Sequence, residues 1–197
     1  TDIKVIAITG SAGKTTTKEM IASILSLVGK TVWTPKSVDS VYNIPNTILK
    51  TPPSTKYLIL EMSVEFPGEM GYYLWLAKPD IAVITNISET HTQYLKSVQG
   101  VANEKEKLIL ALSKNDTAVL NRENDYIKNM AKKTNAKVVW FGKNSDIQAP
   151  KIKIDSSLNT IYTLGIRESK INVQLPIPGK QFVENSLAAA ATAYILG

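Results

Sequence analysis

The sequence predicts an α/β fold: a mostly parallel β-sheet flanked by helices, with a small antiparallel β unit near the carboxyl terminus. Over about three quarters of the 197 residues, short β-rich runs alternate with helical segments, which is the pattern of a parallel sheet with crossover helices. From about Lys151 polar and apolar residues alternate at every second position with turn-like breaks, which is typical of antiparallel strands.

The first predicted elements are a strand and a helix. Val5–Ile8 is a short apolar run rich in β-branched residues, as in a strand that is buried on both faces of a parallel sheet. Apolar residues then recur at helical spacing from Met20 to Val28, and Gly29 is in position to end that helix. This pair predicts the first strand-to-helix unit of the sheet.

Five later β-rich runs are predicted to be strands: Thr31–Pro35, Lys56–Met62, Asp80–Ile87, Asp116–Asn121 and Lys137–Gly142. Between them Gly100–Leu112 has the clearest helical spacing, and the alanine-rich segment Val183–Gly197 is predicted to be the last helix. We therefore expect a parallel α/β core over residues 1–145, an antiparallel unit over 146–180 and a closing helix over 181–197.

Composition and charge exclude several classes of protein. A chain of 197 residues that is 44% hydrophobic can form one sizeable core, and no apolar run reaches the roughly 18 residues that span a bilayer. The absence of cysteine excludes disulfides and thiolate metal sites, which fits the cytoplasm. The lysines behind the net charge of +6 are scattered, so we expect no nucleic-acid partner. A core strand at the start predicts no signal peptide.

The segment "TGSAGKTTT" between the first strand and helix has the composition of a phosphate-binding loop (P-loop). Gly10 and Gly13 allow a tight turn whose N–H groups face a phosphate, and the helix N-terminus adds partial positive charge. Lys14 supplies a full charge, and the hydroxyl of Thr15 would bind magnesium. Ile8 replaces the first glycine of the Walker pattern, so the loop is a shortened variant. The expected nucleotide contacts are Gly10, Ser11, Ala12, Gly13, Lys14, Thr15 and Thr16.

Polar residues that follow the other strands are expected at the same edge of the sheet, where ligands bind in parallel α/β folds. Glu61 ends an apolar strand, and a carboxylate there can bind the magnesium carried by nucleotide phosphates. His91, the single histidine, follows another strand and is a candidate second metal ligand. Lys105 lies on a predicted helix between Glu104 and Glu106, and its spacing alone predicts a solvated surface residue.

Six ordered motifs resemble the central ATPase domain of the Mur ligase family over essentially the whole chain. The motifs are "ITGSAGKTTTKEM", "LILEMSVEFPGEM", "KPDIAVITNISETH", "GVANEKEKLI", "AVLNRENDY" and "GKQFVENSLAAAATAYILG". Within the family the chain is most similar to the branch that joins D-alanyl-D-alanine to UDP-N-acetylmuramoyl-tripeptide. The shortened phosphate loop is typical of this family.

The resemblance implies a catalytic site with ATP and two Mg²⁺ ions. Lys14 and Thr15 would hold the phosphates and the first metal, with Glu61 completing that metal site. His91 would bind the second metal. Lys105 matches a lysine that carbon dioxide converts to a carbamate, which then helps to hold the second metal.

The resemblance also implies a reaction and its partners. Asn185 matches the asparagine that contacts adenine, and Asn121 matches a residue near the base or ribose. A substrate carboxylate, on a UDP-muramoyl peptide, would attack the γ-phosphate, and an amine donor would displace phosphate from the acyl phosphate. Family ligases add an amino-terminal substrate domain and a carboxyl-terminal domain, which we expect to be absent here. The chain alone is therefore expected to bind ATP without completing ligation.

The chain departs from the family pattern where substrate contacts are expected. Asp39, Ser40 and Asn43 replace an asparagine pair and a glycine, and Gln181 and Phe182 replace a histidine and an asparagine. Two alternatives stay open. One is another ligase of the same superfamily, such as a folylpolyglutamate, cyanophycin or poly-γ-glutamate synthetase. The other is a non-catalytic nucleotide-binding module.

Overall fold

Strands and helices alternate along most of the chain. The computed structural model describes residues 3–35 and 39–197. The strands are β1 (Lys4–Thr9), β2 (Thr31–Trp33), β3 (Tyr57–Glu61), β4 (Ile81–Ile84), β5 (Thr117–Asn121), β6 (Lys137–Phe141), β7 (Ile147–Gln148), β8 (Ile152–Ile154), β9 (Thr160–Ile166) and β10 (Ser169–Leu175). The helices are α1 (Lys14–Leu25), α2 (Ser40–Leu49), α3 (Glu69–Leu76), α4 (Thr92–Leu95), α5 (Val98–Leu110), α6 (Asp125–Ala131) and α7 (Lys180–Leu196).

Across the described ranges these strands form a ten-stranded sheet in the order β10-β9-β7-β6-β5-β4-β1-β3-β2, with β8 paired to β9. All neighbours from β2 to β6 are parallel. Because β1 lies between β3 and β4, the segments that follow these three strands meet at one edge of the sheet. The predicted fold class is confirmed, including the antiparallel strands near the carboxyl terminus.

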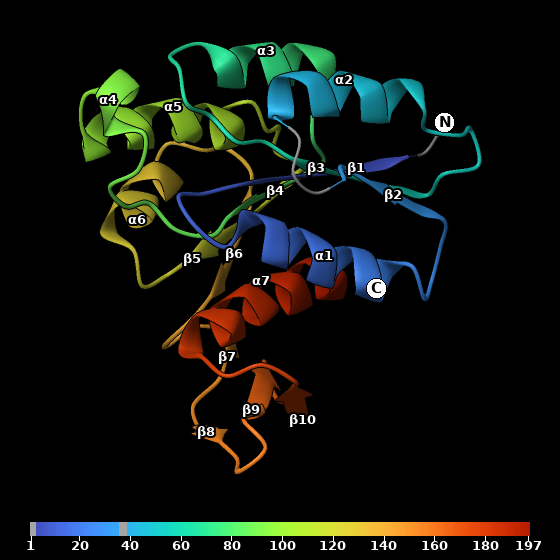
Figure 1. Cartoon of the computed structure of the whole chain (residues 1–197), viewed down its shortest axis with the longest axis vertical. Coiled ribbons are helices and arrows are strands. Elements are labelled where there is room, and N and C mark those ends of the chain that lie inside the picture. Colours follow the sequence, from blue (N-terminus) through green and yellow to red (C-terminus); the bar gives the residue numbers. More distant parts are fainter. Residues whose placement is uncertain (1–2, 36–38) are drawn as a thin grey trace.

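Helices cover both faces of the sheet (Figure 1). α1 and α7 pack against each other on one face, while α2, α3, α5 and α6 cover the other. Ile6 and Ile8 belong to the core that contains residues of α1 and α7, and Ala7 belongs to the opposite core, because successive strand residues point to opposite faces. Burial on both faces explains why the central strands are continuously apolar. No helix in the described ranges is long and apolar enough to cross a membrane.

The antiparallel strands prolong the same sheet. β7 joins β6 in parallel, with Phe141 opposite Ile147, and β9 pairs antiparallel with β7, β8 and β10. β8, β9 and β10 project from the lower end of the molecule in Figure 1. A 2.6 Å hydrogen bond between Tyr162 Oη and Ser186 Oγ ties β9 to α7. The antiparallel strands thus support the helix on which Asn185 lies.

The first helix differs from the prediction in its end and in its buried face. α1 ends at Leu25 rather than near Gly29, and Val28 is 58% exposed. Thr17 and Lys18 lie instead on the buried face. A hydrophobicity pattern assigns such polar residues to the surface, so it found Ile21 and Leu25 on this face but missed Thr17 and Lys18.

Candidate functional site

The phosphate-binding loop follows β1 at the edge where β3 and β4 also end. Gly10 has a φ of 150° and Gly13 a φ of 79°, values that favour glycine strongly. A Cβ atom would lie 2.0 Å from Thr85 Oγ1 at Gly10 and 2.3 Å from Asn185 Oδ1 at Gly13. Backbone conformation and close packing therefore both require glycine at these positions.

The segment after β4 holds the loop in place. The N–H groups of Ser11 and Ala12 donate to the backbone and side-chain oxygens of Asn86, at 3.0 and 2.8 Å. Thr85 Oγ1 donates to the Ala12 carbonyl at 2.6 Å. Two N–H groups that were predicted to bind phosphate are thus already hydrogen-bonded within the protein. A phosphate could contact the N–H groups of residues 13–16, where α1 has no capping side chain and no acidic residue in its first turn.

Lys14 lies folded against this loop. Its Nζ donates to the Gly10 carbonyl at 3.0 Å. Burial lowers the pKa of Lys14, and the carboxylates of Glu61 and Glu65 oppose that shift. An entering phosphate would meet an ammonium group that has already lost much of its water, where charge–charge interactions are stronger than in bulk solvent.

Glu61 is fixed by α1 and by its own backbone. Thr15 Oγ1 donates to Glu61 Oε1 at 2.8 Å, and Lys18 Nζ lies 3.3 Å from Glu61 Oε2. The Glu61 N–H donates to Thr34 Oγ1 at 3.0 Å. Lys18 is fully buried, and its Nζ makes no hydrogen bond within the described residues. Lys18 and Glu61 therefore form a buried ion pair without a hydrogen bond between them.

The pair of Thr15 and Glu61 fits a magnesium ion. A hydroxyl and a carboxylate already in contact are oxygen donors of the type that Mg²⁺ binds, usually with phosphates and water as further ligands. In the part of the chain that the structure describes, no three His, Cys, Asp or Glu side chains are grouped so that they could hold a metal. Phosphate oxygens and water must therefore complete the coordination, which fits a cation that arrives with a nucleotide.

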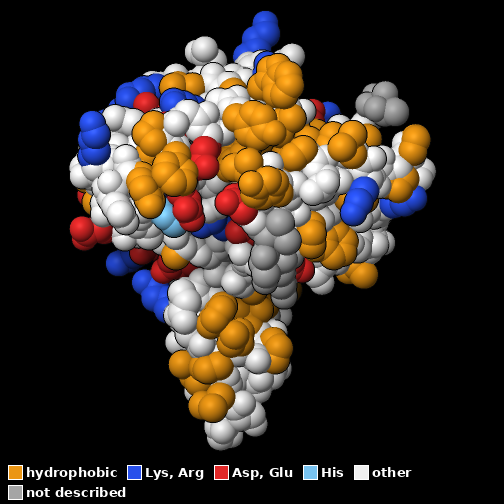
Figure 2. All heavy atoms as spheres, turned by 45° about the horizontal axis from the view of Figure 1, so that its top comes forward, with side chains coloured by type: hydrophobic (Ala, Val, Ile, Leu, Met, Phe, Trp, Pro, Cys, Tyr) orange, Lys and Arg blue, Asp and Glu red, His pale blue; other side chains and the backbone are white. Residues whose placement is uncertain are grey.

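His91 lies in the segment after β4, on the other side of β1 from Glu61. It has a left-handed backbone conformation, with φ of 54°, and immediately precedes α4. Its Nδ1 lies 3.7 Å from Glu65 Oε1, a residue of the segment after β3. Figure 2 shows the pale-blue histidine at the surface beside red carboxylate side chains. The histidine is therefore accessible from the edge of the sheet at which the loop lies.

Lys105 is buried, contrary to the surface position that its spacing alone predicted. It is 1% exposed on the inner side of α5. Burial and then the charge of Lys14 lower the pKa of Lys105 to about 7, while Glu104 and Glu69 oppose the shift. At neutral pH much of its amine is therefore uncharged, and an uncharged amine is the form that can react with carbon dioxide.

Glu104, the neighbour of Lys105, is also buried. Its Oε1 accepts the N–H groups of Gly68 and Met70 at 3.0 and 3.1 Å, and its Oε2 lies 2.6 Å from Lys107 Nζ. These contacts join α5 to the N-terminus of α3. Glu104 thereby fixes the turn of α5 that carries Lys105.

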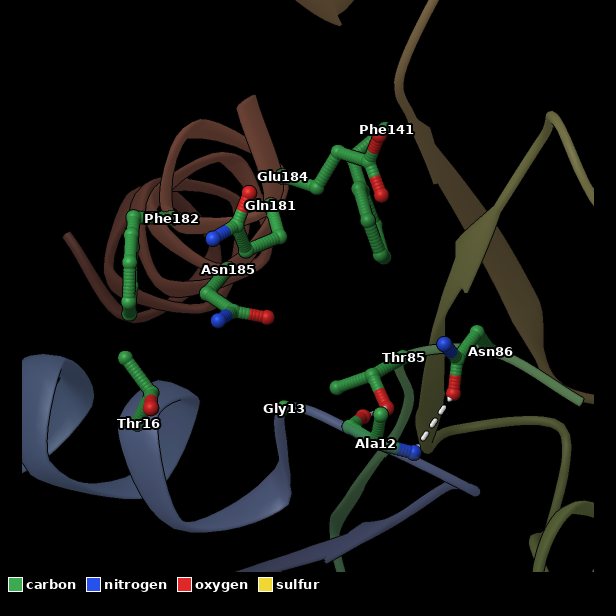
Figure 3. Close-up of a pocket in the computed structure, with 10 residues that line it drawn as sticks. All are labelled: Ala12, Gly13, Thr16, Thr85, Asn86, Phe141, Gln181, Phe182, Glu184 and Asn185. Carbon is green, nitrogen blue, oxygen red and sulfur yellow. Dashed lines mark hydrogen bonds between the residues drawn. The ribbon is translucent and has the colours of Figure 1, made fainter. Parts of the chain in front are cut away.

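A pocket between the P-loop and the start of α7 is suited to a nucleotide base. Figure 3 shows the first turns of α7 facing the loop, with Phe141 of β6 beside them. Aromatic rings provide stacking surfaces for a base, and the amide of Asn185 lies directly over Gly13. The lining residues are Ala12, Gly13, Thr16, Thr85, Asn86, Phe141, Gln181, Phe182, Glu184 and Asn185.

Asn121 lies beneath this pocket and is not among its lining residues. It is 5% exposed, its Nδ2 donates to the Thr85 carbonyl at 2.9 Å, and its Oδ1 accepts the Glu123 N–H at 2.9 Å. These bonds connect the ends of β4 and β5. They indicate a supporting position for Asn121, behind the segment that holds the P-loop.

A second cavity opens beside Thr15 and Glu61. The departures from the family pattern at Asp39, Ser40 and Asn43 all line it. Ser40 Oγ donates to the Glu61 carbonyl at 3.0 Å, so this segment also positions the metal-site carboxylate. The remaining lining residues are Pro35, Ser63 and Glu65.

Motif reasoning from the sequence left out several residues of this site. Lys18, Asn86 and Glu104 are polar or charged, but their partners come from segments distant in the chain. Lys18 could have been found from its position one helical turn after Lys14, which places both side chains on the same side of α1. Phe141 and Phe182 could be recognised only once the fold placed them in one pocket.

Comparison with known proteins identifies the family of the chain. Residues 8–193 match the Mur ligase middle domain. The UDP-N-acetylmuramoyl-tripeptide--D-alanyl-D-alanine ligase of Escherichia coli is 33% identical over 98% of this chain, which spans 44% of that protein. The chain therefore covers less than half of the length of this curated relative.

Solved structures share the fold of this chain. A crystal structure of MurF from Acinetobacter baumannii has a TM-score of 0.94 and 28% identity over 100% of this chain and 43% of its own. MurF ligase from Thermotoga maritima in complex with ADP has a TM-score of 0.87 and 25% identity, covering 100% of this chain and 46% of its own. The chain belongs to the Mur ligase family and constitutes its middle domain, of the MurF-like type.

Proposed function

We propose that the chain binds ATP with Mg²⁺ and activates a substrate carboxylate as an acyl phosphate, as the central domain of a ligase of peptidoglycan precursor synthesis. The observation that carries this proposal is the contact of Thr15 with Glu61 at the P-loop, faced by Asn185 across the loop. The complex of the Thermotoga maritima relative with ADP supports nucleotide binding by this domain.

Each part of the site has a role in phosphoryl transfer. The α1 N-terminus and Lys14 bind and orient the phosphates, and the pocket under Asn185 holds the base. Bound Mg²⁺ would neutralise charge on the transferring phosphoryl group. The substrate carboxylate attacks the γ-phosphate, ADP leaves, and the amine of the second substrate displaces phosphate to form the amide. No nucleophilic side chain is required for these steps.

The partners follow from the relatives that share the motifs. Their name indicates a UDP-N-acetylmuramoyl-tripeptide as the carboxylate substrate and D-alanyl-D-alanine as the amine donor. The cavity at Asp39, Ser40 and Asn43 lies beside the metal position and offers space for the reacting carboxylate. Because this chain is less than half as long as the E. coli relative, we propose that flanking domains bind most of both substrates. The chain alone would then bind ATP without completing ligation.

Isothermal titration with ATP, with and without Mg²⁺, tests the proposal. We expect Mg²⁺ to strengthen ATP binding, and we expect Glu61→Ala to remove most of this enhancement because one of the two contacting oxygen donors is lost. Glu168→Ala, at an exposed position after β9, is the matched control. Absence of binding, or binding that is indifferent to changes at Lys14, Glu61, His91 and Lys105, would contradict the catalytic proposal and favour a non-catalytic module.

Lys105 is expected to form a carbamate with a pH dependence set by its lowered pKa. With a pKa of about 7, roughly half of the amine is uncharged at pH 7, against about 0.03% for a pKa of 10.5. The uncharged nitrogen attacks CO₂ and releases a proton, so carbamate increases as pH rises through 7 and disappears below about pH 6. A ¹³C NMR signal from ¹³C-bicarbonate reports it. Lys105→Arg should abolish the signal. The control is Lys107→Arg, at a half-exposed position of the same helix, which should keep the signal.

A further inference from the structure

We propose that Glu65, together with His91, is a further ligand of the second cation that binds with the nucleotide. This inference rests on the proposed function, because it concerns the same ATP site. It adds a residue that neither the P-loop pattern nor the strand-end position indicates, since Glu65 lies four residues after the end of β3.

Glu65 and His91 meet across the P-loop. Glu65 follows β3 and His91 follows β4, and β1 with its loop lies between these strands. Glu65 Oε1 lies 3.7 Å from His91 Nδ1. This separation is shorter than the sum of two metal–ligand bonds of about 2.1 Å. One cation could therefore bind both atoms after only small side-chain movements.

Two further contacts hold the segments that carry this pair. The rings of Phe66 and Tyr94 lie 4.3 Å apart, between the residue after Glu65 and the first turn of α4. The N–H groups of Glu65 and Phe66 both donate to Glu69 Oε2, at 2.7 and 3.0 Å. The backbone at Glu65 is thus fixed, while its side chain is half exposed and able to reach a ligand.

The charges around Glu65 also point to a shared cation. Glu65 lines the same cavity as Thr15 and Glu61. Two carboxylates therefore face the place where the phosphates of ATP would bring further negative charge. A divalent cation between Glu65, His91 and the phosphates relieves this repulsion.

The ligand set predicts which cation binds and when. A mixed set of one carboxylate oxygen and one imidazole nitrogen suits Mn²⁺ better than Mg²⁺, because Mg²⁺ is a hard cation that prefers oxygen ligands. Because no group of three His, Cys, Asp or Glu side chains occurs within the described residues, phosphate oxygens, with the carbamate of Lys105 where it forms, would supply the further ligands. Glu65 should therefore strengthen cation binding when nucleotide is present and contribute little without it.

The inference is tested by measuring Mn²⁺ binding to the 197-residue chain. Electron paramagnetic resonance monitors this binding with and without ADP. We expect Glu65→Gln to weaken ADP-dependent Mn²⁺ binding about 10-fold or more, as loss of a metal-site group does elsewhere. Glu89→Gln, an exposed glutamate in the segment that carries His91, is the matched control and should bind as the unchanged chain does. Circular dichroism confirms that both variants fold.

The possible results separate this inference from the proposed function. If Glu61→Gln loses Mn²⁺ binding while Glu65→Gln keeps it, Glu65 merely forms an ion pair with His91 and the inference is wrong. If Glu65→Gln tightens ADP binding in the presence of a chelator and leaves Mn²⁺ binding unchanged, Glu65 competes with phosphate and the inference is again wrong. If the unchanged chain binds neither ATP nor ADP with Mg²⁺ or Mn²⁺, the proposed function fails as well.

Discussion

Replacing Lys14 by methionine is expected to weaken ATP binding about 100-fold, because a buried charged contact to phosphate contributes about 2–5 kcal/mol. The Lys14 ammonium is largely desolvated and hydrogen-bonded to the Gly10 carbonyl inside the loop. Methionine has a side chain of similar length, so the loop keeps its packing but loses the charge and the hydrogen bond to the Gly10 carbonyl. Titration calorimetry with ATP and Mg²⁺ measures the change, and thermal unfolding should show that the variant still folds.

A lysine at the opposite end of the first helix provides the control. Lys30 Nζ contacts Ser54 Oγ at the exposed surface, in the segment that leads to β2. Lys30→Met removes the same charge and should leave ATP binding unchanged. If both variants lost affinity equally, the effect would come from the net charge of the protein. If Lys14→Met kept full affinity, phosphate would bind somewhere other than this loop.

The parts of the fold that could be predicted are those encoded by neighbouring residues. The central strands are continuously apolar because both faces are buried, and the glycines of the P-loop lie between a strand and a helix that are adjacent in the chain. Because the ends of neighbouring parallel strands meet at one edge of the sheet, the strand-end position of Glu61 was sufficient to place it near Thr15, which it contacts. Local sequence pattern and strand order together determine the part of the site formed by the P-loop and Glu61.

The parts that could not be predicted depend on contacts between distant segments. Lys105 is buried because α5 packs between α3 and α6, and no helical spacing distinguishes a buried lysine from a solvated one. Lys18 is buried on α1, and its partner Glu61 lies at the end of β3, in a distant part of the chain. The fit of Asn185 over Gly13 joins two segments that only the complete sheet brings together. For Lys105 the family resemblance supplied what spacing could not.

Replacing Glu104 by alanine is expected to have the largest effect on stability. Its carboxylate is the acceptor for the N–H groups of Gly68 and Met70, of which the Met70 group is buried. Alanine leaves both donors without this acceptor and leaves the charge of Lys107 without its partner. Since each unsatisfied buried group costs about 1–3 kcal/mol, we expect the free energy of unfolding to fall by about 3 kcal/mol. That loss corresponds to a decrease of ~6–12 °C in Tm for a chain of this size.

The matched variant Glu104→Gln separates hydrogen bonding from charge. Glutamine keeps one acceptor oxygen in the same position for the N–H groups of Gly68 and Met70, but it lacks the negative charge that pairs with Lys107. Because Lys107 is half exposed, losing that pair should cost only about 1 kcal/mol. Equal losses for the two variants in urea denaturation would show that the ion pair, rather than the bonds to the start of α3, stabilises this junction. A small loss for glutamine and a large one for alanine would establish that α5, with Lys105 on it, is held in place by backbone donors of α3.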